Sequence, residues 1–98
     1  MQFKTDLAFT RESDRGTVVE PAYGGATSFM RRRYTRDLRD ADVAVVGIPF
    51  DLATTNRSGA RLGPRAIRSI SSNLAWEAQV VGWGFDPFER LSVVDYGD

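Results

Sequence analysis

The residues best suited to chemistry are two aspartates near the end of the chain, Asp95 and Asp98. Their carboxylate oxygens are ligands of the kind that hard cations prefer. The 98-residue chain has no histidine, the usual metal ligand and general base, and no cysteine to supply a thiolate. Two carboxylates without a further ligand nearby make an incomplete metal site, so we predict no metal ligand and no catalytic residue here. We expect a polar strand end that positions the loop after it.

A second candidate for ligand binding is the polar loop over residues 50–63, which carries Asn56, two arginines and two glycines. It follows an apolar stretch that we predict to be a parallel strand. Ligands of open α/β sheets bind beyond the carboxyl ends of such strands. Gly59 and Gly63 match neither the phosphate-binding pattern of nucleoside triphosphatases nor the dinucleotide-binding pattern. The loop therefore lies where a ligand would bind, but it carries no nucleotide motif.

An arginine-rich stretch begins at residues 31–33 and continues to Arg39, with aspartates interleaved in its second half. It could be an anion-binding patch, or a solvated or interface face with local Arg–Asp pairs. We favour the second interpretation because the neighbouring acids cancel much of the field. The chain has 13 basic and 13 acidic residues. This balance argues against electrostatic binding to nucleic acid or to a membrane surface.

Four aromatic residues gather between residues 76 and 88. They could form a stacking platform for bases, but packing in a core or a subunit contact is far more common for such side chains. We therefore favour packing for all four, namely Trp76, Trp83, Phe85 and Phe88.

The elements that must position these residues form a strand–helix–strand unit. Residues 43–48 are a short, continuous apolar run before Pro49, which predicts a strand buried on both faces. A helix is expected from Pro64 to near Trp76 or Glu77, with an apolar stripe at Ile67, Ile70 and Leu74. Residues 91–95 predict a second strand. The fold class is thus α/β with a parallel sheet.

The organisation of the chain is that of one small unit with an irregular arm over residues 1–27. Residues 28–98 hold the predicted elements. Two strands and one helix would leave both sheet edges open and one face bare, so we expect part of a larger domain. The chain contains no apolar run near 18 residues and no secretory signal at its start, which favours a cytoplasmic protein without membrane contact.

Three stretches of the chain, read together, resemble the ureohydrolase family, which includes arginase, agmatinase and guanidinobutyrase. They are Val-Val-Gly-Ile-Pro-Phe-Asp over 45–51, Ser-Gly-Ala-Arg-Leu-Gly-Pro-Arg-Ala-Ile-Arg over 58–68, and Val-Val-Asp-Tyr-Gly-Asp over 93–98. The resemblance covers residues 28–98, and residues 50–54, 71–77 and 85–91 look most like bacterial agmatinases.

This resemblance implies a three-layer α/β/α fold, of which the chain is the amino-terminal βαβ portion. It implies a binuclear manganese site, a homo-oligomer of three or six subunits, and a small guanidino substrate. The implied reaction converts agmatine and water to putrescine and urea, in polyamine biosynthesis, by attack of a metal-bridging hydroxide. The family's Gly-Gly-Asp-His, Asp-Ala-His-x-Asp and Asp-x-Asp ligand motifs are absent from this chain. We therefore expect them beyond Asp98 and expect the 98 residues alone to be inactive.

The role of the loop after the first strand stays a hypothesis. Its place at the carboxyl end of a strand suggests that Asn56 and Arg61 line the mouth of a substrate pocket or a subunit contact. Two alternatives remain for the function. The protein could be another ureohydrolase such as a guanidinobutyrase, or a short non-catalytic assembly or binding partner derived from one.

Overall fold

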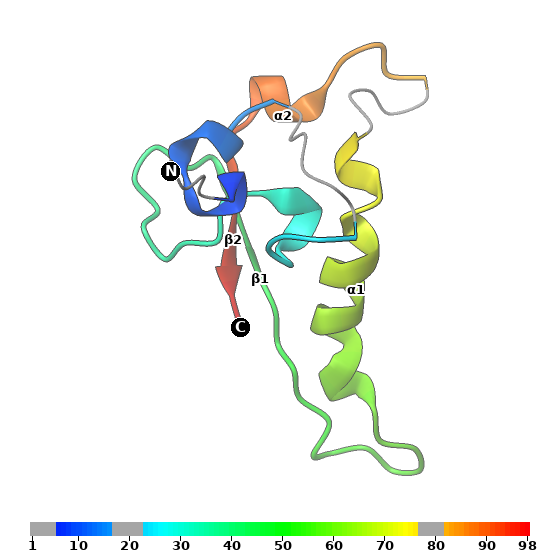
Figure 1. The fold of residues 1–98 in the computed structure, drawn as a ribbon. Helices are drawn as coiled ribbons and strands as arrows, with labels where there is room; N and C mark the ends of the chain where they lie inside the picture. Colours follow the sequence, from blue (N-terminus) through cyan, green and yellow to red (C-terminus); the bar gives the residue numbers. More distant parts are fainter. Residues whose placement is uncertain (1–5, 17–22, 77–81) are drawn as a thin grey trace.

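The structure is a computed structural model that describes residues 6–16, 23–76 and 82–98. Along these residues the order of elements is β1 (Val43–Val46), α1 (Gly63–Ser71), α2 (Pro87–Arg90) and β2 (Val93–Gly97) (Figure 1). Short 3₁₀ turns precede and separate them at Leu7–Phe9, Arg11–Ser13, Phe29–Arg31, Ala60–Leu62 and Leu74–Trp76. None of the described helices has the length and apolar character needed to span a lipid bilayer.

The two strands form the predicted parallel pair. Val43 lies opposite Val93, and Val45 lies opposite Asp95. The register then shifts, so that Val46 pairs with Gly97. Gly97 has a φ of +92°, a conformation that costs glycine little because it has no Cβ. The α/β class and the strand–helix–strand order are confirmed, although the second strand begins two residues later than we predicted.

The outer edge of β2 is covered, which corrects the expectation of two open edges. Tyr34 forms a parallel bridge with Asp95. Around it, the Asp95 N–H donates to the Arg33 carbonyl at 2.9 Å and the Thr35 N–H donates to the Asp95 carbonyl at 2.9 Å. β2 is therefore held on both sides, and Val94 and Asp95 are fully buried.

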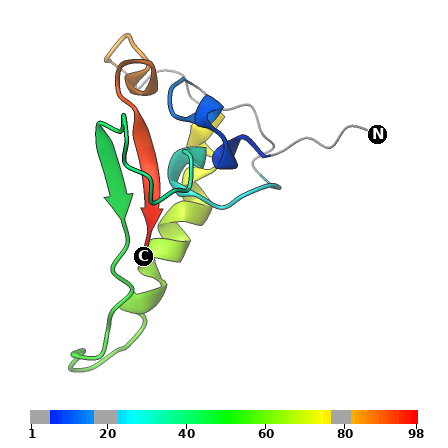
Figure 2. The same cartoon turned by 90° about the vertical axis from the view of Figure 1, so that its left-hand side faces the viewer.

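The first strand is less buried than predicted. We expected it to be covered on both faces, but Val43 and Val46 are 40% and 54% exposed. α1 and the amino-terminal turns lie on the same side of the two strands (Figure 2). The prediction was wrong for these residues because the described chain packs against only one face of β1.

α1 begins one residue before the predicted Pro64 and ends at Ser71. A 3₁₀ turn continues to Trp76, and Glu77 lies outside the described residues. The predicted apolar stripe is exposed: Ile67 and Ile70 are 56% and 63% accessible. The adjoining side of the helix, with Arg68 and Ser71, is buried. It packs inward because its polar groups find partners there, such as Asp95 for Arg68, whereas Ile67 and Ile70 stay more than half exposed.

The arginine triplet is buried, so within the interpretation of a solvated or interface face with local Arg–Asp pairs, solvation and local pairing are wrong for residues 31–33. Arg31 forms an ion pair with Asp6 at 3.1 Å, and Arg33 forms one with Asp14 at 2.6 Å. Arg32 is fully buried, and its Nη1 donates to the Gly16 carbonyl at 2.7 Å. Burial lowers the pKa of Arg32 to about 10. The triplet thus ties the segment over residues 6–16 to the body of the chain.

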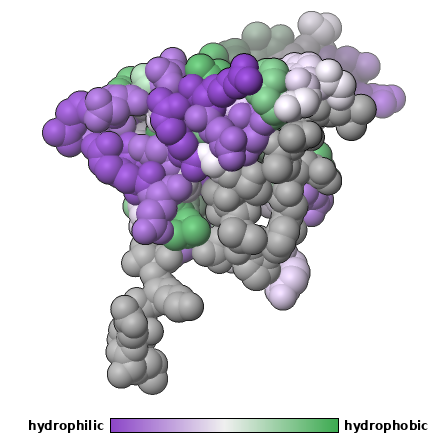
Figure 3. All heavy atoms as spheres, turned by 90° about the horizontal axis from the view of Figure 1, so that it is seen from above, coloured by the Kyte–Doolittle hydropathy of each residue, from purple (hydrophilic) through white to green (hydrophobic). Residues whose placement is uncertain are grey.

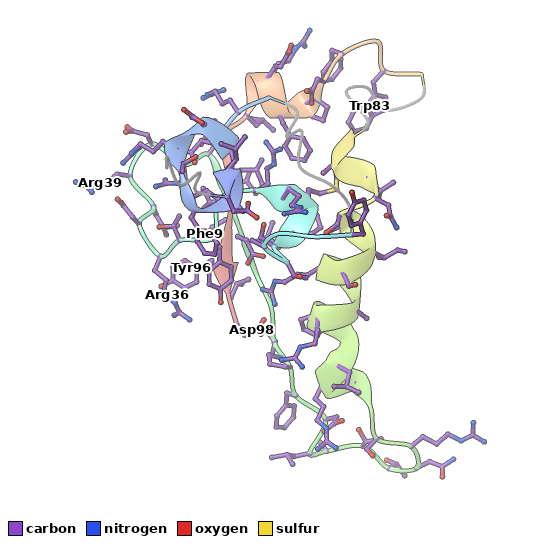
Figure 4. All side chains as sticks on the ribbon, viewed as in Figure 1. Phe9, Arg36, Arg39, Trp83, Tyr96 and Asp98 are labelled. Carbon is purple, nitrogen blue, oxygen red and sulfur yellow. The ribbon has the colours of Figure 1, made fainter. Side chains whose placement is uncertain are left out.

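Several exposed charges lie on the loop over residues 35–42, namely Arg36, Arg39, Asp40 and Asp42. Arg39 and Asp37 form a local pair at 2.6 Å, as the sequence interpretation expected for this part of the stretch. The Arg39 guanidinium lowers the pKa of Asp37 through hydrogen bonds. Hydrophilic residues gather on this side of the molecule in Figure 3, and Arg39 projects away from the ribbon in Figure 4.

The aromatic residues pack with one another and with arginines. Trp83 and Phe85 are stacked at 5.7 Å between ring centroids. The Arg90 guanidinium lies 4.0 Å from the centroid of Phe85, an arrangement that favours the cation electrostatically. Arg32 lies over the ring of Phe88 at 4.3 Å. These contacts support the packing interpretation for Phe85 and Phe88, whereas Trp83 is 56% exposed and the Trp76 side chain lies outside the described part.

Candidate functional site

The carboxyl ends of both strands meet at one edge of the sheet because the strands are parallel. Gly47 follows β1 there and Asp98 follows β2, while α1 brings Arg68 to the same edge. Gly47, Arg68, Asp95 and Asp98 are called the strand-end cluster below. The polar loop between β1 and α1, residues 48–62, is called the β1–α1 loop.

The centre of the strand-end cluster is a buried, bidentate ion pair. Arg68 Nε donates to Asp95 Oδ2 at 2.8 Å, and Arg68 Nη2 donates to Asp95 Oδ1 at 3.0 Å. The same carboxylate accepts from the backbone N–H groups of Phe29 and Gly97, both at 2.8 Å. Both oxygens of Asp95 are therefore occupied. The residue joins α1, β2 and the turn at Phe29 rather than presenting a carboxylate to a ligand.

The surroundings change the proton affinities of both partners. Burial acts to raise the pKa of Asp95, but the hydrogen bonds from Arg68, Phe29 and Gly97 outweigh it and hold the pKa below the ordinary 3.8. The hydrogen bond to Asp95 raises the pKa of Arg68. Both groups are charged at neutral pH, as a buried ion pair with satisfied hydrogen bonds requires.

Asp98 is the outer member of the strand-end cluster. Its Oδ1 accepts from Arg68 Nη1 at 2.7 Å, and its side chain is 44% exposed. It lies at the end of β2, near Arg36 and Tyr96 (Figure 4). Asp98 is also pressed against Gly47, where an added Cβ would collide with the carboxylate. A glycine is needed at position 47 because the carboxylate occupies the space of a side chain.

Two hollows adjoin this edge. One has a volume of about 600 Å³ and combines charged with aromatic walls. The other, of about 370 Å³, is an apolar groove between β1 and α1 that includes Val46, Ile48 and Ile67. The residues lining the larger hollow are Phe9, Ala26, Thr27, Ser28, Tyr34, Arg65, Arg68, Ser69 and Asp98.

The two residues predicted for a pocket mouth, Asn56 and Arg61, lie on the exposed β1–α1 loop. Arg61 approaches Asp51 with Nε–Oδ2 at 3.9 Å, and its backbone N–H donates to the same oxygen at 3.4 Å. The Gly59 N–H also donates to Asp51 at 2.8 Å. Among the described residues, neither Asn56 nor Arg61 forms a hydrogen bond or ion pair with the strand-end cluster, so their substrate role remains a prediction.

The described residues do not supply a metal site. No group of three histidine, cysteine, aspartate or glutamate side chains lies close enough together in that part of the chain to hold an ion. In the strand-end cluster, Asp95 is fully engaged and Asp98 is paired with Arg68. A binuclear metal centre of the type that the resemblance implies therefore does not fit these residues.

Sequence reasoning missed Arg68, because it expected the helix to be buried along the apolar stripe at Ile67, Ile70 and Leu74. Asp95 could have indicated a buried basic partner, because an acidic side chain within the apolar run from Val93 must be paired when it is buried. The small Ser71 and Ser72 on the helix face of Arg68 gave a second indication of close packing.

Comparisons with known proteins agree with this geometry. The model of the Arginase family matches residues 41–98, more than half of the chain. The chain belongs to the arginase family. It is 58% identical over 93 residues to the agmatinase of Chromobacterium violaceum, and 58% identical over 59 residues to the agmatinase of Escherichia coli O1:K1.

A solved arginase-family structure has the same fold. The crystal structure of a hypothetical agmatinase from Burkholderia thailandensis matches with a TM-score of 0.86 and 57% identity over 96% of this chain. The chain spans 29% of that structure and 29% of the Chromobacterium violaceum protein, and 19% of the Escherichia coli protein. The strand-end cluster and the β1–α1 loop lie within the matched family region, residues 41–98.

Proposed function

We propose that this chain is the amino-terminal part of an agmatinase-like guanidino hydrolase that converts agmatine and water to putrescine and urea. The observation that carries the proposal is 58% identity over 95% of the chain to a protein named agmatinase. Similarity at this level, extending through the strand-end cluster, favours agmatine over a more distant guanidino substrate. It also gives no support to the alternative of a non-catalytic partner protein.

We propose that the residues of this chain contribute to the reaction by supporting the fold and by helping to recognise the substrate. The buried Arg68–Asp95 pair fixes the edge of the sheet at which α/β enzymes bind ligands. We propose that the β1–α1 loop, with Asn56 and Arg61, borders the pocket that receives the substrate. The loop lies at the correct edge and is open to solvent, which supports this assignment.

We further propose manganese as the cofactor of the whole protein, bound by residues outside this chain. When bound, such ions lower the pKa of a water molecule to make it a nucleophile. The described residues of this chain do not include the cluster of ligand side chains that such a metal needs. The proposal also includes a cytoplasmic location and a homo-oligomer of three or six subunits.

The experiment that tests this function is a urea-release assay on the whole protein that contains these 98 residues, supplied with manganese. Agmatine, arginine and 4-guanidinobutyrate are compared at equal concentrations. We expect kcat/KM for agmatine to exceed that of either competitor at least tenfold. A preference for 4-guanidinobutyrate would replace the substrate assignment, and urea release from none of the three would overturn the hydrolase assignment.

A further inference from the structure

The two ends of the β1–α1 loop lie close together, and this narrow part is called the base of the loop. Gly47 precedes the loop and Pro64 is the second residue of α1, and a Cβ placed on Gly47 would lie only 2.9 Å from the Cβ of Pro64. Figure 1 shows the loop extending well beyond the two strands. Loops with adjoining ends and a projecting middle are compact units that often carry function. The orientation of such a loop depends on the contacts that hold its two ends together.

Asp98 lies near that base and contacts Gly47, which precedes the loop, and Arg68 of the helix that follows it. Its Oδ1 is held by Arg68 of α1 at 2.7 Å and lies against Gly47 on the opposite side. The Gly47 N–H donates to the Gly97 carbonyl at 2.8 Å, so the start of the loop is tied to the end of β2 as well. One carboxylate therefore joins the exit of β1, the end of β2 and α1.

The middle of the loop has few restraints of its own. Residues 52–62 are all exposed. The hydrogen bonds that fold its second half back converge on Asp51, which accepts from the N–H groups of Gly59 and Arg61 at 2.8 and 3.4 Å. Because exposed backbone without apolar contacts opens at low cost, the position of the loop is set mainly at its base.

We propose that Asp98 and Arg68 are positioning residues that keep the base of the β1–α1 loop closed and thereby present Asn56 and Arg61 to the guanidino substrate. The substrate part of this inference rests on the proposed function. Loss of the Asp98–Arg68 contact lets the loop sample positions in which it cannot bind, which weakens substrate binding without changing the chemical step. The effect falls on KM and not on kcat.

The test uses the whole protein with manganese and two variants. Asp98→Asn removes the charge while keeping the shape, and Gly47→Ala places a Cβ against both the Asp98 carboxylate and the Pro64 Cβ. Asp37→Asn is the matched control, since Asp37 pairs with Arg39 at 2.6 Å on an exposed loop. Trypsin cleavage after Arg57 and Arg61 is measured together with KM and kcat for agmatine.

We expect both variants to be cleaved in the loop roughly three- to tenfold faster than wild type and the control, with KM raised by a similar factor and kcat within twofold. Wild-type cleavage rates in Asp98→Asn would overturn the proposal, whatever the rate in Gly47→Ala. Faster cleavage with an unchanged KM would overturn its substrate part. If no protein, wild type included, releases urea while both variants are cleaved faster, the proposed function fails and the base-closing role stands.

Discussion

Arg68 of α1 binds Asp95 of β2 through two nitrogens, at 2.8 and 3.0 Å, inside a region where Asp95 is fully buried. This pair joins the helix to the sheet where a hydrophobic contact would be more usual. The carboxylate also accepts two backbone N–H groups. Removing either partner would therefore leave an uncompensated charge and several unpaired donors or acceptors.

Replacing Asp95 with alanine is expected to destabilise the protein by about 3–5 kcal/mol, because the buried Arg68 guanidinium loses its bidentate partner and keeps only the half-exposed Asp98. The free energy of unfolding, measured by urea denaturation of the whole protein, checks this. The double replacement Arg68→Met with Asp95→Leu should recover part of the loss, since no charge then stays buried. Equal destabilisation by the single and double variants would contradict the account.

The stability of the protein is expected to fall in acid through Asp95. The folded-state pKa of Asp95 is lowered, so its contribution is fully present above the ordinary value of 3.8 and is lost as the pH falls toward the folded value. Unfolding curves recorded from about pH 5 down to about pH 2 measure the loss. Asp95→Asn should flatten this dependence, and an unchanged slope in that variant would assign the acid sensitivity to other carboxyl groups.

Gly97→Ala is expected to destabilise the protein more than Gly84→Ala. Both glycines have positive φ, +92° and +74°, so both replacements carry a backbone penalty. An added Cβ at Gly97 would also lie 2.7 Å from the Tyr34 hydroxyl oxygen, whereas the space around Gly84 is open. The difference in unfolding free energy should be about 1 kcal/mol. Equal losses would mean that the Tyr34 ring moves aside without cost.

Arg33→Ala is expected to weaken the attachment of residues 6–16 by breaking the buried pair with Asp14 at 2.6 Å. Faster hydrogen exchange over residues 8–14, measured by mass spectrometry, would report this loosening. Arg39→Ala, which breaks a pair of the same length at the surface, serves as the control and should leave exchange unchanged. Identical exchange in the two variants would show that Arg33 does not hold the segment.

The exposed apolar face of α1 should be covered in the whole protein. Ile70 is 63% exposed in this chain, while the relatives are more than three times as long, since the chain spans 29% of them. Ile70→Glu is expected to lower the melting temperature of the whole protein by several degrees, because a charge would replace a buried side chain. An unchanged melting temperature would place this face in solvent in the whole protein too.

The sequence was sufficient to predict the strands, the helix and their parallel order, because the apolar runs and Pro64 are local signals. It was insufficient for burial. Val46 and Ile70 follow patterns of buried residues, yet they are exposed here because their partners are not among the described residues. It also missed the buried Arg31–Arg33 triplet, whose partners Asp6 and Asp14 are chosen by tertiary contacts.

The same distinction applies to the candidate site. The position of Asp98 at a strand end followed from the apolar run before it, and so did the place of the β1–α1 loop. The contact of Asp98 with Arg68 could not be predicted from the apolar run, because it joins residues that are 30 positions apart. Long-range pairing of this kind depends on how α1 is rotated about its axis, and the stripe at Ile67 and Ile70 predicted that a different side of the helix would be buried.

The most direct test of the central claim is product analysis after incubating the whole protein with agmatine and manganese. Putrescine and urea are quantified by mass spectrometry over a time course. The account predicts that the two products appear in equal amounts and at the same rate, as hydrolysis of the guanidinium group requires. Absence of both products, or putrescine formed without urea, would contradict the assignment of this chain to an agmatine-hydrolysing enzyme.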